Sequence, residues 1–389
     1  MRKIFLLAGA MLLALGSCTN EINEEGFVDK TNAISFNAYP NKTRAVIGDV
    51  TSENMKDDNF GVFGYYNNSP YLYVSDNSTK KAVEQYWKAN AENTSGTWEY
   101  NTISDIKFWP NGSMDFFAYF PYSANATFAD NNNSEGAIMT IPNQTCDKDV
   151  LFTKQTTAYQ ERVPLTFHHA FSKIQGLNIK VNGGNVGEAE VVVTVKDIEF
   201  INTSTSGDVI VDKDGNASYN VASTNVTLKK DFSSSPTEIS KNLADGVNLI
   251  SSRENCYLFA TNQSTTATNN VKGIGKTMWD GVKANLNGTK LPNSNFVCLK
   301  LTCKVKDKTH YFVGSESEDD YGTVYIPLTG NDADPKTVTE LSAGKRYTYN
   351  IVFSHNIGFN EDGDPILKPI LFNVSSVDSW GDVNVTITL

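Results

Sequence analysis

The apolar residues of this chain fall in short runs in which apolar and polar side chains alternate, a period of two that is typical of β-strands. Ile34, Phe36 and Ala38 form one such run, and residues 163–169 form another. Residues 114–120 are apolar at nearly every position, which indicates a strand buried on both faces or packed under a second sheet. Because Asn, Ser, Gly and Asp fill the stretches between the runs, the pattern predicts an all-β protein of many short strands.

Turn signals support this interpretation, and chain length indicates how the strands are divided. Asp214-Gly215 is a hairpin signal, and only residues 80–91 have the composition of a helix of a few turns. The 389 residues exceed what one hydrophobic core usually serves. We therefore expect two β-sandwich domains, residues 31–170 and residues 171–389.

The first residues have the pattern of an export signal. Arg2 and Lys3 precede an apolar run, residues 4–15, that is too short to cross a membrane as a helix. The run leads into small residues suited to a peptidase pocket and then into a cysteine, in the order Leu15-Gly16-Ser17-Cys18.

This order resembles the lipobox of bacterial lipoproteins, a family in which the cysteine is acylated and becomes the first residue after cleavage. The resemblance implies a signal peptide over residues 1–17 and a lipid anchor on Cys18. Several acyl chains on one residue hold a protein stably on a membrane. The acidic residues that follow have no apolar period, so residues 18–30 are expected to form a solvated tether. The alternative is an ordinary secretory signal with a cysteine at this place by chance.

The charge of the chain excludes one class of partner. The formal net charge is −11, and loss of Arg2 and Lys3 with the signal makes the mature chain more acidic still. An acidic protein is repelled by phosphate backbones, so we expect no nucleic acid partner.

The cysteines other than Cys18 have two interpretations. Cys298 and Cys303 are an odd number of residues apart, which places them on opposite faces of one strand. No two cysteines have the Cys-x-x-Cys spacing, which argues against a zinc or redox motif. We expect Cys146, Cys256, Cys298 and Cys303 to be small buried hydrophobes, with one or two disulfides as the alternative.

Several stretches together resemble the fimbrillin family of type V pili, and they follow one another along most of the mature chain. They are Phe108-Trp109-Pro110, residues 115–121, residues 164–174, residues 341–350 and residues 377–380. The resemblance implies two transthyretin-like β-sandwich domains and export as a lipoprotein to the cell outer membrane. It also implies trimming by an arginine-directed protease and assembly with other fimbrillin subunits by strand exchange, in a homopolymer or a mixed fimbrium.

The sequence supplies a candidate site for such trimming. Arg44 and Ala45 follow the alternating run of Ile34, Phe36 and Ala38. Cutting after Arg44 would detach this strand together with the lipid. A sandwich that loses a strand exposes an apolar groove and unpaired backbone N–H and C=O groups, which another strand must fill. The alternative is that Arg44 is an ordinary loop arginine that is not cut.

The end of the chain supplies a candidate donor strand. Val383, Val385, Ile387 and Leu389 alternate strictly with polar residues. Each apolar side chain of such a strand contributes about 1.5–3 kcal/mol when it is buried, before ordering and association costs. We hypothesise that this tail fills the groove of the next subunit, as in donor-strand complementation. The simpler alternative is that it is the last strand of its own domain.

The sequence offers little for catalysis or for a metal. His168 and His169 are adjacent and point to opposite faces of a strand, which favours a packing or hydrogen-bonding role. Residues 212–216 resemble half a calcium loop, but their flanks predict a hairpin turn. Residues 316–320 form an acidic loop of the kind that is usually solvated. Because no nucleophile, zinc-protease or phosphate-loop motif occurs, we expect no enzyme and no cofactor.

The first half is rich in aromatic residues set among Asn and Ser. We expect these side chains to fill the sandwich, with a glycan- or host-protein-binding face as the alternative. They are Tyr65, Tyr66, Tyr71, Tyr73, Tyr86, Trp87, Trp98 and Tyr100. The leading interpretation is therefore a structural and adhesive pilus subunit at the cell surface. The alternative is a non-polymerising surface lipoprotein that binds a glycan or a host protein.

Overall fold

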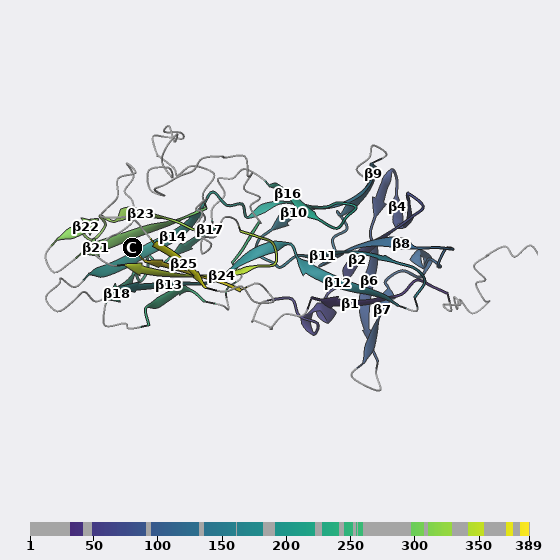
Figure 1. The fold of residues 1–389 in the computed structure, drawn as a ribbon, viewed down its shortest axis with the longest axis horizontal. Helices are drawn as coiled ribbons and strands as arrows, with labels where there is room; N and C mark the ends of the chain where they lie inside the picture. Colours follow the sequence, from purple (N-terminus) through teal and green to yellow (C-terminus); the bar gives the residue numbers. More distant parts are fainter. Residues whose placement is uncertain are drawn as a thin grey trace, which may run out of the picture.

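The structure is a computed structural model, and it confirms the all-β fold expected from the sequence (Figure 1). It describes residues 32–41, 49–90, 95–131, 136–160, 162–181, 191–221, 228–240, 245–251, 254, 256–259, 297–306, 310–328 and 341–353, and the backbone of 371–375 and 382–388. Over these ranges the only helices are two short 3-10 turns, η1 (Asn54–Asp57) and η2 (Ile103–Asp105). Among the same residues no helix has the length and hydropathy needed to cross a membrane.

An eight-stranded sheet forms the centre of the first half, in the order β1-β12-β11-β8-β2-β6-β7 with β3 paired to β2. The strands β4 and β5 form a separate two-stranded sheet. The strands are β1 (Phe36–Pro40), β2 (Phe60–Tyr66), β3 (Ser69–Leu72), β4 (Val74–Asp76), β5 (Thr79–Lys81), β6 (Val83–Ala89), β7 (Gly96–Tyr100), β8 (Met114–Phe120), β11 (Leu151–Thr157) and β12 (Val163–His169).

The helix predicted over residues 80–91 is wrong, because most of this stretch forms the strand β6. Lys, Ala, Glu and Gln in this stretch favour a helix locally. In the structure Val83 and Gln85 are buried, and β6 pairs with β2 on one side and β7 on the other. The long-range pairing, which sets Trp87 opposite Trp98, overrides the local preference.

The eight-stranded sheet is buried on both faces, as the run at 114–120 predicted. Phe116 and Ala118 of β8 face one hydrophobic core, whereas Phe117 and Tyr119 face another. All four side chains are at most 1 % exposed. The first core lies within the curl of the sheet, where β1 comes into contact with β7.

A four-stranded sheet covers the other face, and it draws strands from both halves of the sequence. Its order is β16-β15-β10-β9. Its strands are β9 (Thr127–Asn131), β10 (Gly136–Thr145), β15 (Ser206–Val211) and β16 (Ala217–Val221). Met139 and Ile141 of β10 stand opposite Val211 and Val209 of β15, and all four are buried in one core. The hairpin β15–β16 thus returns to strands that precede residue 170, next to β10 in Figure 1.

The rest of the chain forms a sandwich of two six-stranded sheets. One has the order β19-β13-β24-β26-β25 with β20 paired to β13, and the other has the order β17-β14-β21-β22 with β18 paired to β14 and β23 to β21. Their strands are β13 (Phe171–Val181), β14 (Val192–Ile201), β17 (Leu228–Asp231), β18 (Thr237–Ser240), β19 (Val247–Ile250), β20 (Tyr257–Phe259), β21 (Cys298–Lys306), β22 (Tyr311–Val313), β23 (Gly322–Pro327), β24 (Arg346–Phe353), β25 (Leu371–Ser375) and β26 (Asp382–Thr388).

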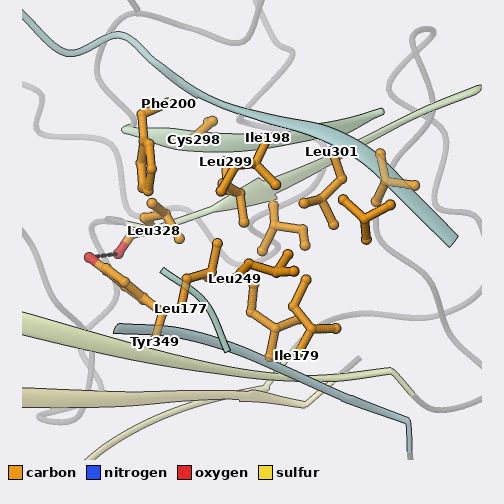
Figure 2. Close-up of a cluster of buried hydrophobic side chains, with 14 of the residues drawn as sticks. Leu177, Ile179, Ile198, Phe200, Leu249, Cys298, Leu299, Leu301, Leu328 and Tyr349 are labelled. Carbon is orange, nitrogen blue, oxygen red and sulfur yellow. Dashed lines mark hydrogen bonds between the residues drawn. The ribbon is translucent and has the colours of Figure 1, made fainter. Parts of the chain in front are cut away.

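The core of this sandwich consists of hydrophobic side chains from both sheets where the two face each other (Figure 2). Ile198 and Leu299 from one sheet point toward Leu177 and Tyr349 from the other. The hydroxyl of Tyr349 donates a hydrogen bond to the carbonyl of Leu328 at 3.4 Å, which satisfies the polar end of this buried ring.

One long stretch of backbone connects the two halves. The strand β12 ends at His169 and β13 begins at Phe171, so only Ala170 separates them. The amide of Ala170 donates a hydrogen bond to the carbonyl of Val150, at 2.7 Å. The predicted boundary at 170/171 falls at this one-residue connection; Tyr73 and Ala82 are likewise single residues between consecutive strands.

Candidate functional site: assembly elements and a buried charge cluster

The predicted displaced strand is the edge strand β1. It pairs with β12 in parallel, with Phe36 opposite Val163 and Ala38 opposite Leu165. Ile34, just before the strand, and Phe36 are buried, and Ala38 is partly buried. The polar neighbours point outward, so the alternation seen in the sequence is the alternation between the core and solvent.

Phe36 is the residue through which β1 enters the core. Its ring centroid lies 5.6 Å from that of Phe116, 6.1 Å from that of Phe60 and 6.4 Å from that of Tyr100. Because Tyr100 belongs to β7, at the far end of the sheet order, Phe36 links the two ends of the curled sheet. Removal of β1 would therefore open this core between β12 and β7.

The predicted lipid and cleavage sites lie outside the described residues. Cys18 precedes them, and Arg44 and Ala45 fall between Asn41 and Asp49. The ends of this gap are held at different places. The Asn41 amide bonds to the Phe167 carbonyl at 2.8 Å, whereas Asp49 is buried in the charge cluster described below.

The predicted donor strand is β26, and within the single chain it belongs to its own sheet. It runs parallel to β24 and antiparallel to β25, between the two. Its register sets Val383 opposite Tyr347, Val385 opposite Tyr349 and Ile387 opposite Ile351; Leu389 lies outside the described residues. The structure does not bring β26 to β1 within one chain, because they belong to different sheets. Donation to a second subunit stays a prediction.

A cluster of buried charges that the sequence did not reveal lies at the junction of the two halves. The Nζ atom of Lys173 lies 2.6 Å from Oδ1 of Asp49, and NH1 of Arg346 lies 3.7 Å from Oδ2. All three side chains are at most 3 % exposed. The Tyr257 hydroxyl also donates to Asp49 Oδ1, at 3.4 Å, and the Lys173 ammonium lies 5.1 Å from the centroid of the Tyr257 ring.

The two cations of this cluster come from two of the stretches that carry the family resemblance. Lys173 lies in residues 164–174 and Arg346 in residues 341–350, and they face each other in the parallel register of β13 and β24. Like charges directly opposite in a sheet repel. The carboxylate of Asp49 compensates both.

A second pair of buried polar side chains lies beside the first. Nδ1 of His169 lies 2.7 Å from Oδ2 of Asp149, and both side chains are at least 95 % buried. The backbone amide of Val50 donates to the same Asp149 oxygen, at 3.3 Å. The side chain of His168 is exposed on the opposite face; partial desolvation of its ring, together with the neighbouring His169, lowers its pKa. The predicted opposite orientation of these histidines and the hydrogen-bonding role of one of them are confirmed.

Sequence reasoning missed this cluster because its members are far apart in the chain. Asp49 and Lys173 are separated by 124 positions. The available signal was composition: a lysine within the apolar alternation of β13 has to find a partner if it is buried. Nothing local identifies Asp49 as that partner.

Four of the cysteines are buried and form no disulfide, which confirms their interpretation as small hydrophobes. This holds for Cys146, Cys256, Cys298 and Cys303. Burial raises the pKa of each thiol, and the carboxylate of Asp197 raises that of Cys303 further, to about 12. Thiols held in the protonated form are poor nucleophiles and poor metal ligands.

The hairpin predicted at Asp214-Gly215 is confirmed as the turn between β15 and β16. Gly215 has a φ of +87°, which favours glycine. Asp212 Oδ1 accepts the amides of Asn216 and Asp214, at 2.8 and 2.9 Å. Although burial acts to raise the pKa of Asp212, these hydrogen bonds lower it overall. The loop oxygens are thus used by the turn itself.

The acidic loop at 316–320 is exposed, as expected. No group of three or more His, Cys, Asp or Glu side chains in the described part of the chain is arranged to hold a metal ion.

The aromatic residues of the first half mostly contact one another. Trp87 and Trp98 have ring centroids 5.5 Å apart, and Tyr66 and Tyr71 have centroids 6.0 Å apart. Tyr65 packs edge-on against Phe128 at 5.8 Å. These contacts support the packing interpretation. The alternative, a ligand-binding face, stays a prediction.

Comparisons with known proteins found solved structures that resemble this chain. No curated protein matches the chain. A fimbrial protein from Bacteroides vulgatus has a similar structure, with 15 % identity and a TM-score of 0.42 over 91 % of this chain and 97 % of that one. A fimbrilin from Porphyromonas gingivalis is similar with 11 % identity and a TM-score of 0.36 over 92 % of this chain and 97 % of that one.

The assignment to a family comes from the sequence itself. A family described as fimbrillin-like matches residues 43–365 of the 389, a range that includes the stretches at 108–121, 164–174 and 341–350. This confirms the resemblance seen in those stretches. The chain belongs to the fimbrillin-like family.

Proposed function

We propose that this chain is a structural and adhesive subunit of a surface fimbria with no catalytic site. It is exported as a lipoprotein, anchored in the outer membrane through Cys18, and trimmed after Arg44. The trimmed subunit then polymerises with other fimbrillin subunits by donor-strand exchange. Membership in the fimbrillin-like family supports a fimbrial or adhesive role at the cell surface.

The observation that carries the proposal is the position of β1. This strand lies at the edge of its sheet, its Phe36 side chain is 1 % exposed within the core, and Arg44 follows it in the sequence. A cut after Arg44 leaves β1 held by non-covalent contacts alone. Once β1 leaves, the apolar groove and the open edge of β12 require a replacement strand.

The C-terminal strand has the pattern that this groove needs. Val383, Val385 and Ile387 alternate with polar residues at the same spacing as Ile34, Phe36 and Ala38. The strand β26 also already runs parallel to a neighbour, β24, as β1 runs parallel to β12. Transfer to a second subunit exchanges pairing with β24 and β25 for pairing with the β12 of that subunit.

Burial of the tail gives the scale of the exchange. Four apolar side chains, with Leu389 as the fourth, contribute on the order of 6–12 kcal/mol gross. Ordering and association costs reduce this value. The loss of the pairing of β26 with β24 and β25 in its own subunit reduces it further. The net gain therefore depends on a groove that trimming has emptied, which makes cleavage the step that permits assembly.

The test is polymerisation after defined cleavage. Mature protein is treated with an arginine-specific protease, and its mass and N-terminus are measured before native and mild-denaturant electrophoresis. We expect a chain that starts at Ala45 and a ladder of polymers. Arg44→Gln should stay uncut and monomeric, and deletion of residues 383–389 should allow the cut but abolish the ladder.

One outcome would remove the proposal. If the chain that starts at Ala45 remains monomeric, and amide hydrogen exchange shows β26 as protected as before the cut, donor-strand assembly is wrong. A surface lipoprotein that binds a glycan or a host protein then becomes the better interpretation.

A further inference from the structure

Asp49 and Val50, the first residues after the proposed cleavage site that the structure describes, are fixed at the junction of the two halves. Asp49 is only 1 % exposed, and its carboxylate contacts Lys173 of β13 and Arg346 of β24. The next residue, Val50, donates its amide to Asp149, which also binds His169 of β12. Both strands that meet at Ala170 are therefore tied to this segment.

The chain remains fixed after Val50. The side-chain amide of Asn54 donates to the Asp49 carbonyl at 2.8 Å, and the Met55 amide donates to the Thr51 carbonyl at 2.9 Å. Met55 itself is buried in the core of the first half. The short helix η1 thus continues the attachment that Asp49 begins.

The charges explain why Asp49 is needed. Lys173 and Arg346 are register partners on adjacent parallel strands, and both are almost completely buried. Two buried cations side by side are strongly unfavourable unless an anion compensates them. The carboxylate of Asp49 forms an ion pair with each of the two.

We propose that Asp49 is an anchor. It is a positioning residue that holds the start of the trimmed chain at the junction while the residues up to Arg44 leave. This inference rests on the proposed cut after Arg44. Ala45 lies four residues before Asp49, so the new N-terminus begins close to a fixed point. Trimming then opens the edge of β12 without disturbing the junction, because the carboxylate that compensates Lys173 and Arg346 is retained.

The first test uses the uncut chain and amide hydrogen exchange measured by mass spectrometry. Asp49→Asn keeps the shape of the side chain and removes its charge, and Asp57→Asn is the matched control because Asp57 is exposed. We expect Asp49→Asn to speed exchange in β13 and β24 by on the order of a hundredfold, because an uncompensated buried charge is left behind. The control should leave exchange unchanged. Equal exchange in both variants would overturn the proposal.

A second variant covers the case in which Asp49→Asn does not fold. Lys173→Met removes one cation at similar length, so the double variant Asp49→Asn, Lys173→Met contains one buried cation instead of two. We expect the double variant to fold and its thermal midpoint to lie above that of Asp49→Asn. If Lys173→Met lowers the midpoint equally with and without Asp49, the two residues are not coupled and the proposal is wrong.

The trimmed wild-type chain separates this inference from the proposed function. In the trimmed monomer, before it polymerises, we expect faster exchange in β12 and unchanged exchange in β13, which does not pair with β26. Faster exchange in β13 of the trimmed monomer would overturn the anchor while leaving strand exchange intact. If the bond after Arg44 is not cut, the proposed function fails and so does the division of the chain at that bond, whereas the Asp49→Asn comparison still decides the charge role of Asp49.

Discussion

The ring of Phe36 stands edge-on against the ring of Phe116, with 5.6 Å between the centroids and 82° between the planes. This contact joins the edge strand β1 to β8, in the middle of the sheet. An edge strand that only covers a sheet can be lost with little effect. An edge strand with an aromatic ring buried in the core cannot be lost without leaving a groove.

The first prediction tests this role of β1. Phe36→Ala should destabilise the uncut protein by about 3–5 kcal/mol, because it removes a buried ring and leaves a cavity. Asn37→Ala, at the exposed neighbouring position, should cost less than about 0.5 kcal/mol. Denaturant unfolding measures both values. Similar costs for the two variants would show that β1 does not contribute to the core.

The second prediction concerns a close approach within the first sheet. Gly61 of β2 is opposite Tyr119 of β8, and a Cβ at residue 61 would lie 2.4 Å from the Tyr119 ring. The ring is fully buried, and its hydroxyl donates to the Ser123 carbonyl at 2.6 Å, so it cannot move aside. Gly61→Ala should cost about 1–3 kcal/mol in denaturant unfolding. The same change should cost less beside Tyr119→Leu; an equal cost would contradict the steric cause.

The third prediction concerns the hairpin β15–β16. A fragment of residues 31–170 lacks this hairpin, so Met139 and Ile141 of β10 lose the strand that stands opposite them. We expect the fragment to bind a hydrophobic dye and to unfold without a cooperative transition. A fragment of residues 31–221 supplies the missing strands and is the matched comparison. A monomeric 31–170 fragment with a sharp transition would contradict the prediction.

The fourth prediction follows from the buried thiols. Burial raises the pKa of Cys303 to about 12, whereas the pKa of an unfolded cysteine is about 8.5. Between these values the unfolded chain binds fewer protons than the folded chain, so the free energy of unfolding falls as pH rises and is unaffected below this window. The denaturant midpoint should therefore fall from about pH 8.5 upward. Cys303→Val removes this titrating group, and it should make the fall less steep; an unchanged slope would contradict the thiol contribution.

The strands that the sequence predicted are those whose period of two coincides with burial. Ile34 and Phe36 alternate because one side of β1 faces the core, and residues 114–120 are apolar throughout because β8 has a core on each face. A hairpin turn such as Asp214-Gly215 is equally readable, because its hydrogen bonds are local. Local pattern and local bonding suffice for features of this kind.

The features that were missed depend on contacts between distant residues. The stretch around Val83 was predicted as a helix because its pairing with β2 and β7 is not visible in its own composition. The pairing of β10 with β15 and the ion pair of Asp49 with Lys173 have the same character. A lysine within a buried strand predicts that a carboxylate lies nearby, but only the fold determines which carboxylate it is.

The single residue between β12 and β13 has a mechanical consequence. A pull applied along β12 passes through the covalent backbone at Ala170 into β13, and from there through parallel ladders into β24 and β26. Tension between the two halves is therefore carried along the continuous backbone of β12 and β13. The hydrogen bonds between β13, β24 and β26 share this load. The packing between the halves does not have to resist it.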